Sequence, residues 1–328
     1  MNKKKKLRVL SGIQPSGSLH LGNYFGMMSR MIDHQENNEL FCFIADYHAL
    51  TSTPKADVLS SNIFNAACDF LALGLDHEKT NFWIQSDVPA VTELAWILAS
   101  QTNIGLMERS TSYKDKLSKG IKPNMGLYSY PILMAADILL FNTELVPVGK
   151  DQKQHLEITR DIANRFNHTF GKTFTIPTPD IKSETQLIPG IDGQKMSKSY
   201  KNTIPIFGSE KIIRKKIMSI ITDNASVDLP KNKNSTLFEL YCLFLNLEEK
   251  ENLINRYDGR GLRYGDIKIE LYDRVMDYFS PYRQKREQFF SRPDDVFDIL
   301  SLGAKKVNII ALETIEKVRL VTGLSHTI

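Results

Sequence analysis

Short apolar runs alternate with longer stretches of helical periodicity in the first half of the chain. The apolar runs cover residues 7–10, 40–45, 81–85 and 145–148, a length typical of buried strands. Between them, apolar residues recur at helical spacing over about 20–34, 57–73, 91–100 and 131–141. This alternation predicts an α/β fold with a parallel sheet wrapped by helices, in which ligands bind beyond the carboxyl ends of the strands.

The second half of the chain has a different pattern. Residues 175–193 are interrupted by prolines and glycines, which predicts an irregular connection. After Pro205 the pattern is helical only, with apolar residues at helical spacing over 237–247, 267–279 and 302–321. We therefore expect two domains, an α/β domain over residues 1–205 and a helical bundle over residues 206–328.

The composition is that of a globular protein with a full core, since 42% of the 328 residues are hydrophobic and 24% are charged. No apolar run approaches the roughly 18 residues that cross a bilayer, and the lysine-rich start lacks the apolar segment of a signal peptide. A cytoplasmic protein with no membrane partner is expected. Cys42, Cys68 and Cys242 are too widely spaced for a disulfide framework or a metal cage, and the net charge of +4 permits a polyanionic partner without requiring one.

A loop rich in glycine, proline and serine follows the first predicted strand. It lacks the GxGxxG dinucleotide fingerprint, and no GxxxxGK[ST] P-loop occurs anywhere in the chain. Its glycines allow the backbone to approach a bulky ligand, and the helix that begins near His20 directs unpaired N–H groups at that ligand. His20 and Asn23 share one face of this helix and could both donate to phosphate oxygens. Taken alone, such a segment is more often an ordinary capped turn.

A second candidate segment is Lys195-Met196-Ser197-Lys198-Ser199, in a loop preceded by Gly193. Two lysines three residues apart, with hydroxyl groups beside them, suit the oxygens of a triphosphate. A flexible loop can also close over a ligand and leave again. Taken alone, a charged run of this kind is more often a solvated surface loop.

Together the two segments resemble the paired signatures of the class I aminoacyl-tRNA synthetases. His-Leu-Gly-Asn at 20–23 is similar to the HIGH signature, and residues 195–199 match KMSKS letter for letter. Residues 134–140 and 146–155 further resemble the bacterial-type tryptophanyl-tRNA synthetase family, and the similarity covers nearly the whole chain. This resemblance implies a Rossmann-like catalytic domain over residues 1–205, which includes the KMSKS loop, and an all-helical anticodon-binding domain over residues 206–328.

The resemblance also implies an ATP site, assembled from the first loop and helix, the segment after the fourth strand, and the KMSKS loop. Its expected members are Gln14, Pro15, Ser16, Gly22, Asn23, Gly149, Lys150, Asp151, Leu187, Lys195, Met196, Ser197, Lys198 and Ser199. The catalytic roles fall to His20, Asn23, Lys195 and Lys198, and a mobile lysine that reaches the phosphates matches Lys116. Lys150 and Leu10 depart from the family pattern, which has an acid and an aromatic residue there in many relatives.

For the amino-acid pocket, the residue of greatest interest is Asp137, which lies in an apolar helical run. A buried carboxylate is costly unless it is satisfied, so a capping or ion-pairing role is one explanation. The other follows from the resemblance, because an indole has one donor and no acceptor, and an acceptor-only carboxylate complements it. The remaining expected tryptophan-binding residues are Met134, Ile138, His48, Val146, Val148 and Gln152.

The implied reaction is attack of the tryptophan carboxylate on the α-phosphorus of ATP, followed by transfer to the terminal ribose of tRNA(Trp). No general base is needed because the carboxylate is already ionised, and Mg²⁺ would arrive with ATP since no carboxylate cluster marks a protein cage. The resemblance also suggests a homodimer. Alternatives are a tyrosine-activating relative, a catalytically silent paralogue that binds RNA or tryptophan, and another nucleotidyl transferase.

Overall fold

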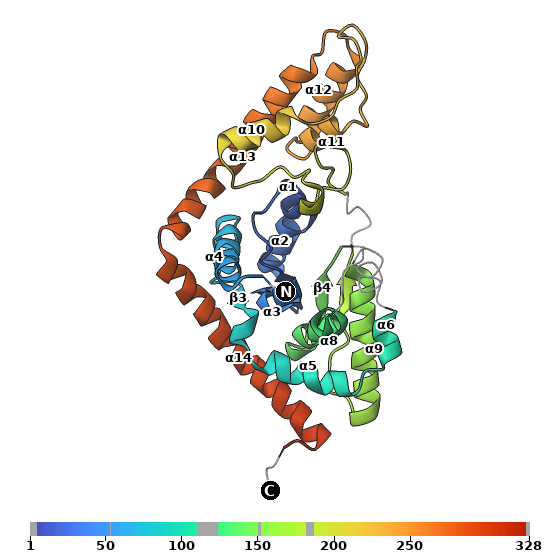
Figure 1. Ribbon diagram of the computed structural model, residues 1–328, viewed down its shortest axis with the longest axis vertical. Coiled ribbons are helices and arrows are strands. Elements are labelled where there is room, and N and C mark those ends of the chain that lie inside the picture. The colour runs from blue at the N-terminus through green and yellow to red at the C-terminus, as the bar shows by residue number, and fades with distance from the viewer. Residues whose placement is uncertain (1–4, 53, 110–123, 150–151, 182–186, 326–328) are drawn as a thin grey trace. The chain divides into compact units, whose positions relative to one another are not determined.

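The computed structural model describes residues 5–52, 54–109, 124–149, 152–181 and 187–325 (Figure 1). The chain forms two compact units. The first unit contains the described residues up to Gly17, those between Met31 and Ser183, and those from Phe289 onward. The second unit contains Ser18–Arg30 and residues 187–288. Each unit is described separately below.

The first unit is built on a five-stranded parallel sheet with strand order β3-β2-β1-β4-β5. The strands are β1 (Arg8–Ile13), β2 (Glu39–Ile44), β3 (Asn81–Ile84), β4 (Leu145–Pro147) and β5 (Thr178–Asp180). The predicted α/β fold with a parallel sheet is confirmed. The first four strands overlap the four apolar runs, although β1 continues to Ile13, three residues beyond the first run. The fifth strand was not predicted because it has three residues, one of them Pro179, and lies in the stretch interpreted as irregular.

Helices connect and cover the strands of this sheet. The first unit contains most of α2 (Ser29–Asn37). Its other described helices are α3 (Asp46–Ala49), η2 (Leu50–Ser52), α4 (Ala56–Ala72), η3 (Gln85–Asp87), α5 (Ala90–Ser100), α6 (Ile104–Glu108), α8 (Met125–Leu140), α9 (Lys153–Phe170) and α14 (Pro293–Thr322). Helix α8 packs against both α5 and α9. Its inward side chains, including Ala135, Ile138 and Leu139, join Phe41 and Trp83 of the sheet in one buried core.

The long helix α14 packs along β3 and also contacts α5 (Figure 1). The contact with β3 is close because Gly303 has no side chain. A Cβ atom at this position would lie 1.9 Å from the carbonyl oxygen of Phe82. In the contact between α14 and α5, Arg319 makes two charge-assisted hydrogen bonds of 2.6 Å to the carboxylate of Glu93.

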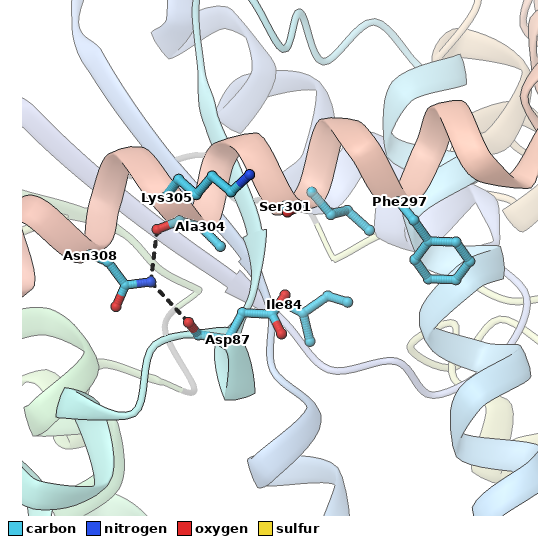
Figure 2. Close-up of a pocket in the computed structure, with 8 residues that line it drawn as sticks. Ile84, Asp87, Phe297, Ser301, Ala304, Lys305 and Asn308 are labelled. Carbon is cyan, nitrogen blue, oxygen red and sulfur yellow. Dashed lines mark hydrogen bonds between the residues drawn. The ribbon is translucent and has the colours of Figure 1, made fainter.

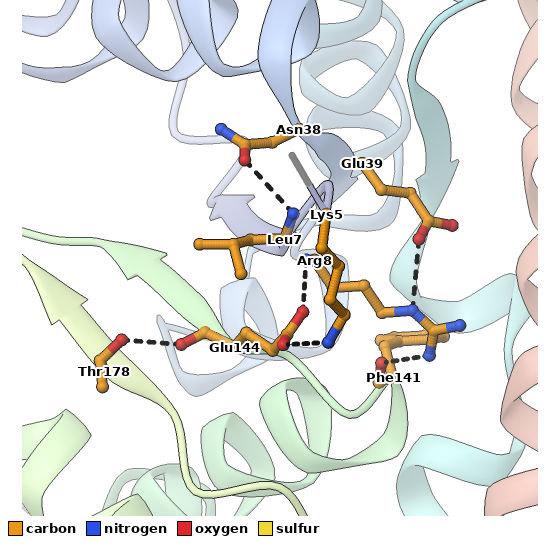
Figure 3. A network of polar contacts seen from close by, with 8 residues as sticks. All are labelled: Lys5, Leu7, Arg8, Asn38, Glu39, Phe141, Glu144 and Thr178. Carbon is orange, nitrogen blue, oxygen red and sulfur yellow. Dashed lines mark hydrogen bonds and ion pairs between the residues drawn. The ribbon is translucent and has the colours of Figure 1, made fainter. Parts of the chain in front are cut away.

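A polar network joins the amino-terminal ends of β1, β2, β4 and β5 (Figure 3). The carboxylate of Glu144, just before β4, accepts from the ammonium of Lys5 at 2.8 Å and from the backbone N–H of Arg8 at 3.1 Å. The guanidinium of Arg8 then donates to Glu39 on β2, and the backbone carbonyl of Glu144 accepts from the hydroxyl of Thr178 on β5. The hydrogen bond from Lys5 lowers the pKa of Glu144, so this carboxylate is ionised at neutral pH.

The second unit is helical among its described residues. It contains α1 (Leu21–Asn23), the π-helical η1 (Tyr24–Met28), η5 (Lys198–Tyr200), α10 (Glu210–Met218), α11 (Thr236–Cys242), α12 (Leu247–Asp258) and most of α13 (Tyr264–Phe290). The predicted helical pattern over 237–247 is split, because α11 ends at Cys242 and α12 begins at Leu247. Aromatic rings from η1 and α13 pack edge to face, with Tyr24 and Phe279 5.2 Å apart between centroids.

The compact units divide the chain differently from the boundary expected at residue 205. The first unit includes α14, which the sequence placed in the helical part, and the second includes residues 18–30 from the sheet-bearing half. The division of activities between residues 1–205 and 206–328 stays a prediction. Within the described ranges, no helix combines the length and the apolar character needed to span a bilayer.

Candidate active site

The two motif segments lie side by side in the second unit. The backbone N–H of Leu21 donates to the carbonyl of Ile204 at 3.0 Å, and the N–H of Ile206 donates to the carbonyl of Leu19 at 3.1 Å. Between them, His20 and Pro205 form an antiparallel bridge. The start of the first helix is therefore attached to the chain that leaves the KMSKS loop.

A direct contact between the two motifs joins Gly22 and Met196. The backbone N–H of Gly22 donates to the thioether sulfur of Met196 at 3.2 Å, and the Met196 side chain is buried. A Cβ atom on Gly22 would lie 3.0 Å from the ring of His20 and 3.1 Å from the Cβ of Met196. A side chain at position 22 would therefore displace the imidazole or the loop methionine, because both lie against this position.

His20 is buried at the start of this helix, with 6% of its surface exposed. Burial lowers the pKa of the imidazole to about 4, and the nearby charge of Lys198 adds to the effect. The ring is therefore neutral at physiological pH and can act as a hydrogen-bond donor but not as a cation. Its Nδ1 is buried without a hydrogen-bond partner in the described part of the chain. Asn23 uses its Oδ1 locally, accepting from the backbone N–H of His20 at 3.1 Å.

Asn202 shapes the KMSKS loop from inside, although the sequence analysis did not identify it. Its Oδ1 accepts from the N–H of Ser197 at 2.8 Å, and its Nδ2 donates to the carbonyl of Lys195 and to the carboxylate of Asp192. The side chain is 2% exposed, so these bonds are shielded from water. Asn202 therefore holds the backbone of the loop in place, and the side chains of Lys195 and Lys198 are exposed.

The other expected members of this loop lie at its surface. The hydroxyls of Ser197 and Ser199 are 2.8 Å apart and hydrogen-bonded to each other. Leu187 is 66% exposed and lies one residue before Ile188, whose carbonyl accepts from the N–H of Met196. Leu187 is thus close along the chain to the loop, and its predicted nucleotide contact stays a prediction.

The first unit holds the remaining expected ATP-site residues. Gln14, Pro15 and Ser16 directly follow β1, and Gln14 Nε2 donates to the backbone carbonyl of His48 at 3.2 Å. Gly149 follows β4, and its carbonyl accepts from the N–H of Gln152 at 3.0 Å. These positions lie beyond the carboxyl ends of parallel strands, where ligands of such sheets bind. Lys116, Lys150 and Asp151 lie outside the described residues.

Asp137 is buried in the first unit and accepts one hydrogen bond on each carboxylate oxygen. His48 Nε2 lies 2.8 Å from Oδ2, and Gln85 Nε2 donates to Oδ1 at 2.7 Å. Burial raises the pKa of Asp137, whereas the hydrogen bonds from His48 and Gln85 oppose this effect. The structure therefore brings two predicted residues, Asp137 and His48, together with Gln85, which the sequence analysis missed.

The other residues expected around tryptophan occupy the core and its margin. Ile138 and Val146 are fully buried in the core, and Met134 and Val148 are partly buried against it. Tyr130, on the same helix as Asp137, was not predicted. Its hydroxyl is hydrogen-bonded to His155 Nε2, and its ring centroid lies 6.4 Å from that of His48. His48, which bonds to Asp137, is thus also close to the hydrogen-bonded pair of Tyr130 and His155.

Two further observations concern sites elsewhere in the described residues. No group of three or more His, Cys, Asp and Glu side chains is arranged to hold a metal ion among them. A separate cavity of about 470 Å³ lies where α14 passes the end of β3 (Figure 2). It is lined by Ile84, Asp87, Phe297, Leu300, Ser301, Ala304, Lys305 and Asn308. None of the predicted site residues lines this cavity.

The joined motifs and the parallel sheet agree with a comparison of the chain with known families. Residues 1–280 match the family model described as tRNA synthetases class I (W and Y). The chain belongs to this family. The resemblance to class I synthetases that the motifs indicated is confirmed.

Individual members of this synthetase family are similar over nearly the whole chain. The tryptophan–tRNA ligase of Fusobacterium nucleatum is 48% identical over 318 residues, which cover 97% of this chain and 98% of the relative. The crystal structure of tryptophanyl-tRNA synthetase from Campylobacter jejuni, complexed with ADP and tryptophan, is 48% identical with a TM-score of 0.92 and covers 97% of this chain and 100% of that one. The Mycoplasma pneumoniae tryptophanyl-tRNA synthetase has a TM-score of 0.84 at 31% identity, covering 98% of this chain and 99% of that one.

Proposed function

We propose that this chain activates L-tryptophan with ATP and transfers it to the 3′-terminal ribose of tRNA(Trp), as a cytoplasmic homodimer. The observation that carries the proposal is the contact between the backbone N–H of Gly22 and the sulfur of Met196. It joins the HIGH-like helix start to the KMSKS loop, and a single nucleotide can be held only if the two are adjacent. The names of relatives that are 48% identical over nearly their full length support the choice of tryptophan.

The chemistry of the first step is positioning and charge stabilisation. As the tryptophan carboxylate attacks the α-phosphorus, negative charge grows on the phosphate oxygens and the leaving pyrophosphate. The exposed ammonium groups of Lys195 and Lys198 supply cations. His20 is neutral, so it contributes a directional N–H donor and does not repel the nearby ammonium group of Lys198.

Mg²⁺ arrives with the nucleotide in this proposal. A hard cation of this kind neutralises phosphate charge and commonly binds through the phosphates with few protein ligands. The described residues contain no three-residue group of metal-binding side chains that would provide a separate cage. The protein therefore needs only to hold the phosphates from the helix start and from the KMSKS loop.

The amino acid is selected by Asp137. One lone pair on each carboxylate oxygen is used by His48 or Gln85, which leaves further acceptor capacity for an indole N–H. A pocket that pairs a buried acceptor with this N–H rejects apolar amino acids that cannot donate, because the acceptor would be left unsatisfied. Met134 and Val148 provide apolar surface near this position.

In the second step the terminal ribose hydroxyl of the tRNA attacks the activated carbonyl group. We assign anticodon binding to the helices within residues 206–328, where α10 carries the basic residues Lys211, Arg214, Lys215 and Lys216. Such residues bind phosphates without regard to sequence. Their contribution should be visible as a salt-dependent affinity for tRNA.

The decisive test is ATP–pyrophosphate exchange with the purified chain and each of the twenty amino acids in turn. Tryptophan alone should drive exchange, and tRNA(Trp) should then be charged. Exchange driven by tyrosine would replace the proposal with the related tyrosine activity. Failure of every amino acid would instead favour a silent paralogue that binds tryptophan or RNA, which calorimetry with tryptophan would detect.

A single substitution tests the role proposed for Asp137. The substitution Asp137→Ala should weaken tryptophan binding and reduce discrimination against phenylalanine, because the acceptor for the indole N–H is removed. If the variant rejects phenylalanine as well as the wild type does, the acceptor lies elsewhere.

A further inference from the structure

Gln85 is a buried polar residue at the carboxyl end of β3, in the short helical turn η3. Its side chain is 1% exposed. A fully buried glutamine is uncommon, since its amide must find partners for two donor hydrogens and one acceptor oxygen. Of the two polar atoms of the Gln85 amide, only Nε2 has a partner among the described residues, and it donates to Asp137 at 2.7 Å.

The other end of the amide has no partner in the described part of the chain. Gln85 Oε1 is buried without a hydrogen bond, which costs free energy because the oxygen has lost its bonds to water. Turning the amide over would not remove this cost, because it would place Oε1 against the oxygen of the carboxylate. The charge of Asp137 therefore sets the orientation of the amide, and the bond to the anion offsets the unsatisfied oxygen.

Gln85 and His48 hold the Asp137 carboxylate from two different elements. Gln85 on η3 occupies Oδ1, and His48 on α3 occupies Oδ2. Two donors on two oxygens define the plane of the carboxylate, so its remaining lone pairs have fixed directions. A carboxylate held by one donor alone could rotate about its Cβ–Cγ bond, and its acceptor directions would not be defined.

The same donors stabilise the ionised form of Asp137. Burial raises its pKa, and the negative charge of Asp46 on α3 acts in the same direction. The hydrogen bonds from His48 and Gln85 act in the opposite direction. On α8 and α9, Tyr130 and His155 are hydrogen-bonded to each other, and the Tyr130 ring lies 6.4 Å from that of His48. If Asp137 were protonated, it would present a donor where the indole N–H needs an acceptor.

We propose that Gln85 is a specificity-determining positioning residue, which holds Asp137 as an oriented anionic acceptor for the N–H of the indole ring. This assignment rests on the proposed function, because it takes the substrate to be tryptophan. Gln85 acts through Asp137 and needs no contact with the substrate itself.

The test replaces Gln85 with methionine, which has a similar length and no amide donor. Exchange is measured with tryptophan and with β-(3-benzothienyl)alanine, in which sulfur replaces the indole N–H. The ratio of the two kcat/KM values reports the hydrogen bond to the N–H alone. In Gln85→Met this ratio should fall about tenfold or more, since a misdirected acceptor no longer distinguishes N–H from sulfur. The KM for ATP should be unchanged.

The pH dependence separates positioning from general loss of structure. In Gln85→Met, the kcat/KM for tryptophan should decline as the pH is lowered from 8 to 6, because Asp137 has lost a donor that favours its ionised form. The wild type should be flatter over this range. Gln35→Met is the matched control, because Gln35 is also a buried glutamine of the first unit but bonds to Gly74 and Asp76. Its discrimination ratio should match that of the wild type.

A second variant, Gln85→Glu, keeps the shape of the side chain if methionine prevents folding. A protonated glutamic acid at this position can donate to Asp137, and an ionised glutamate repels it. Discrimination by Gln85→Glu should therefore approach the wild-type ratio at pH 6 and fall as the pH rises, the reverse of the methionine variant.

The outcomes distinguish this assignment from the proposed function. Tryptophan-dependent exchange in the wild type, with an unchanged discrimination ratio in Gln85→Met and Gln85→Glu, would overturn the role of Gln85 alone. Absence of tryptophan-dependent exchange in the wild type would overturn both. A drop in the ratio that Gln35→Met reproduces would show a structural effect and would also refute the assignment.

Discussion

The protonation state of His20 gives the most sharply defined prediction. Its pKa is lowered from 6.5 to about 4, so the folded chain favours the neutral ring while the unfolded chain binds a proton at about pH 6.5. Stability from this residue is therefore fully present above pH 6.5 and is lost as the pH falls towards 4. The difference is equivalent to roughly 3 kcal/mol, and solvent around the exposed loop reduces the expected loss to about 2 kcal/mol.

Two measurements check this value. NMR of the histidine ring protons should show one resonance, absent in His20→Gln, that titrates near pH 4. Urea unfolding of the wild type should lose about 2 kcal/mol more between pH 7 and pH 4 than unfolding of His20→Gln, because glutamine does not titrate. The matched control is His77→Gln, an exposed histidine of the first unit, which should keep the wild-type pH dependence. A His20 resonance that titrates near pH 6.5 would refute the reasoning.

Three further outcomes follow from the structure. Lys198→Ala should slow pyrophosphate exchange by on the order of 100-fold with little change in tryptophan affinity, and an unaltered rate would discard its role at the phosphates. Gly303→Ala should destabilise the first unit by about 1–3 kcal/mol in urea unfolding, because the new Cβ meets the carbonyl of Phe82. Gly265→Ala is its control, since a Cβ atom there would meet nothing within 4 Å beyond its own helix; equal stability of the two variants would contradict the close packing of α14. Gly22→Ala should lower kcat/KM for ATP by about tenfold through displacement of Met196 or the His20 ring, and wild-type kinetics would show that this contact tolerates a methyl group.

Local pattern was sufficient for the main architecture. The apolar runs at β1 to β4 were recognisable because a strand buried on both faces is continuously apolar. The fifth strand was not recognisable, since Thr178–Asp180 is short and contains a proline. It is a strand because β4 offers an unpaired edge, and the pairing of Val146 with Pro179 is a property of the folded sheet alone.

The same division applies to the candidate site. Motif residues such as His20 and Lys198 could be named from the sequence because their order and spacing are specific. Gln85 and Asn202 could not, because each is important through what it bonds in space: Asp137 is 52 positions from Gln85 along the chain. A polar residue directly after a strand was the one available signal for Gln85.

The sequence by itself determined the alternating α/β pattern, the helical second half and the two signature motifs, since these depend on residue type and short-range spacing. Only the tertiary structure decided that Met196 covers the N–H of Gly22, that α14 returns to pack on β3, and that two donors hold Asp137. These features join residues far apart in the chain. Their free energy comes from burial and hydrogen bonding, which exist only once the distant segments are packed together.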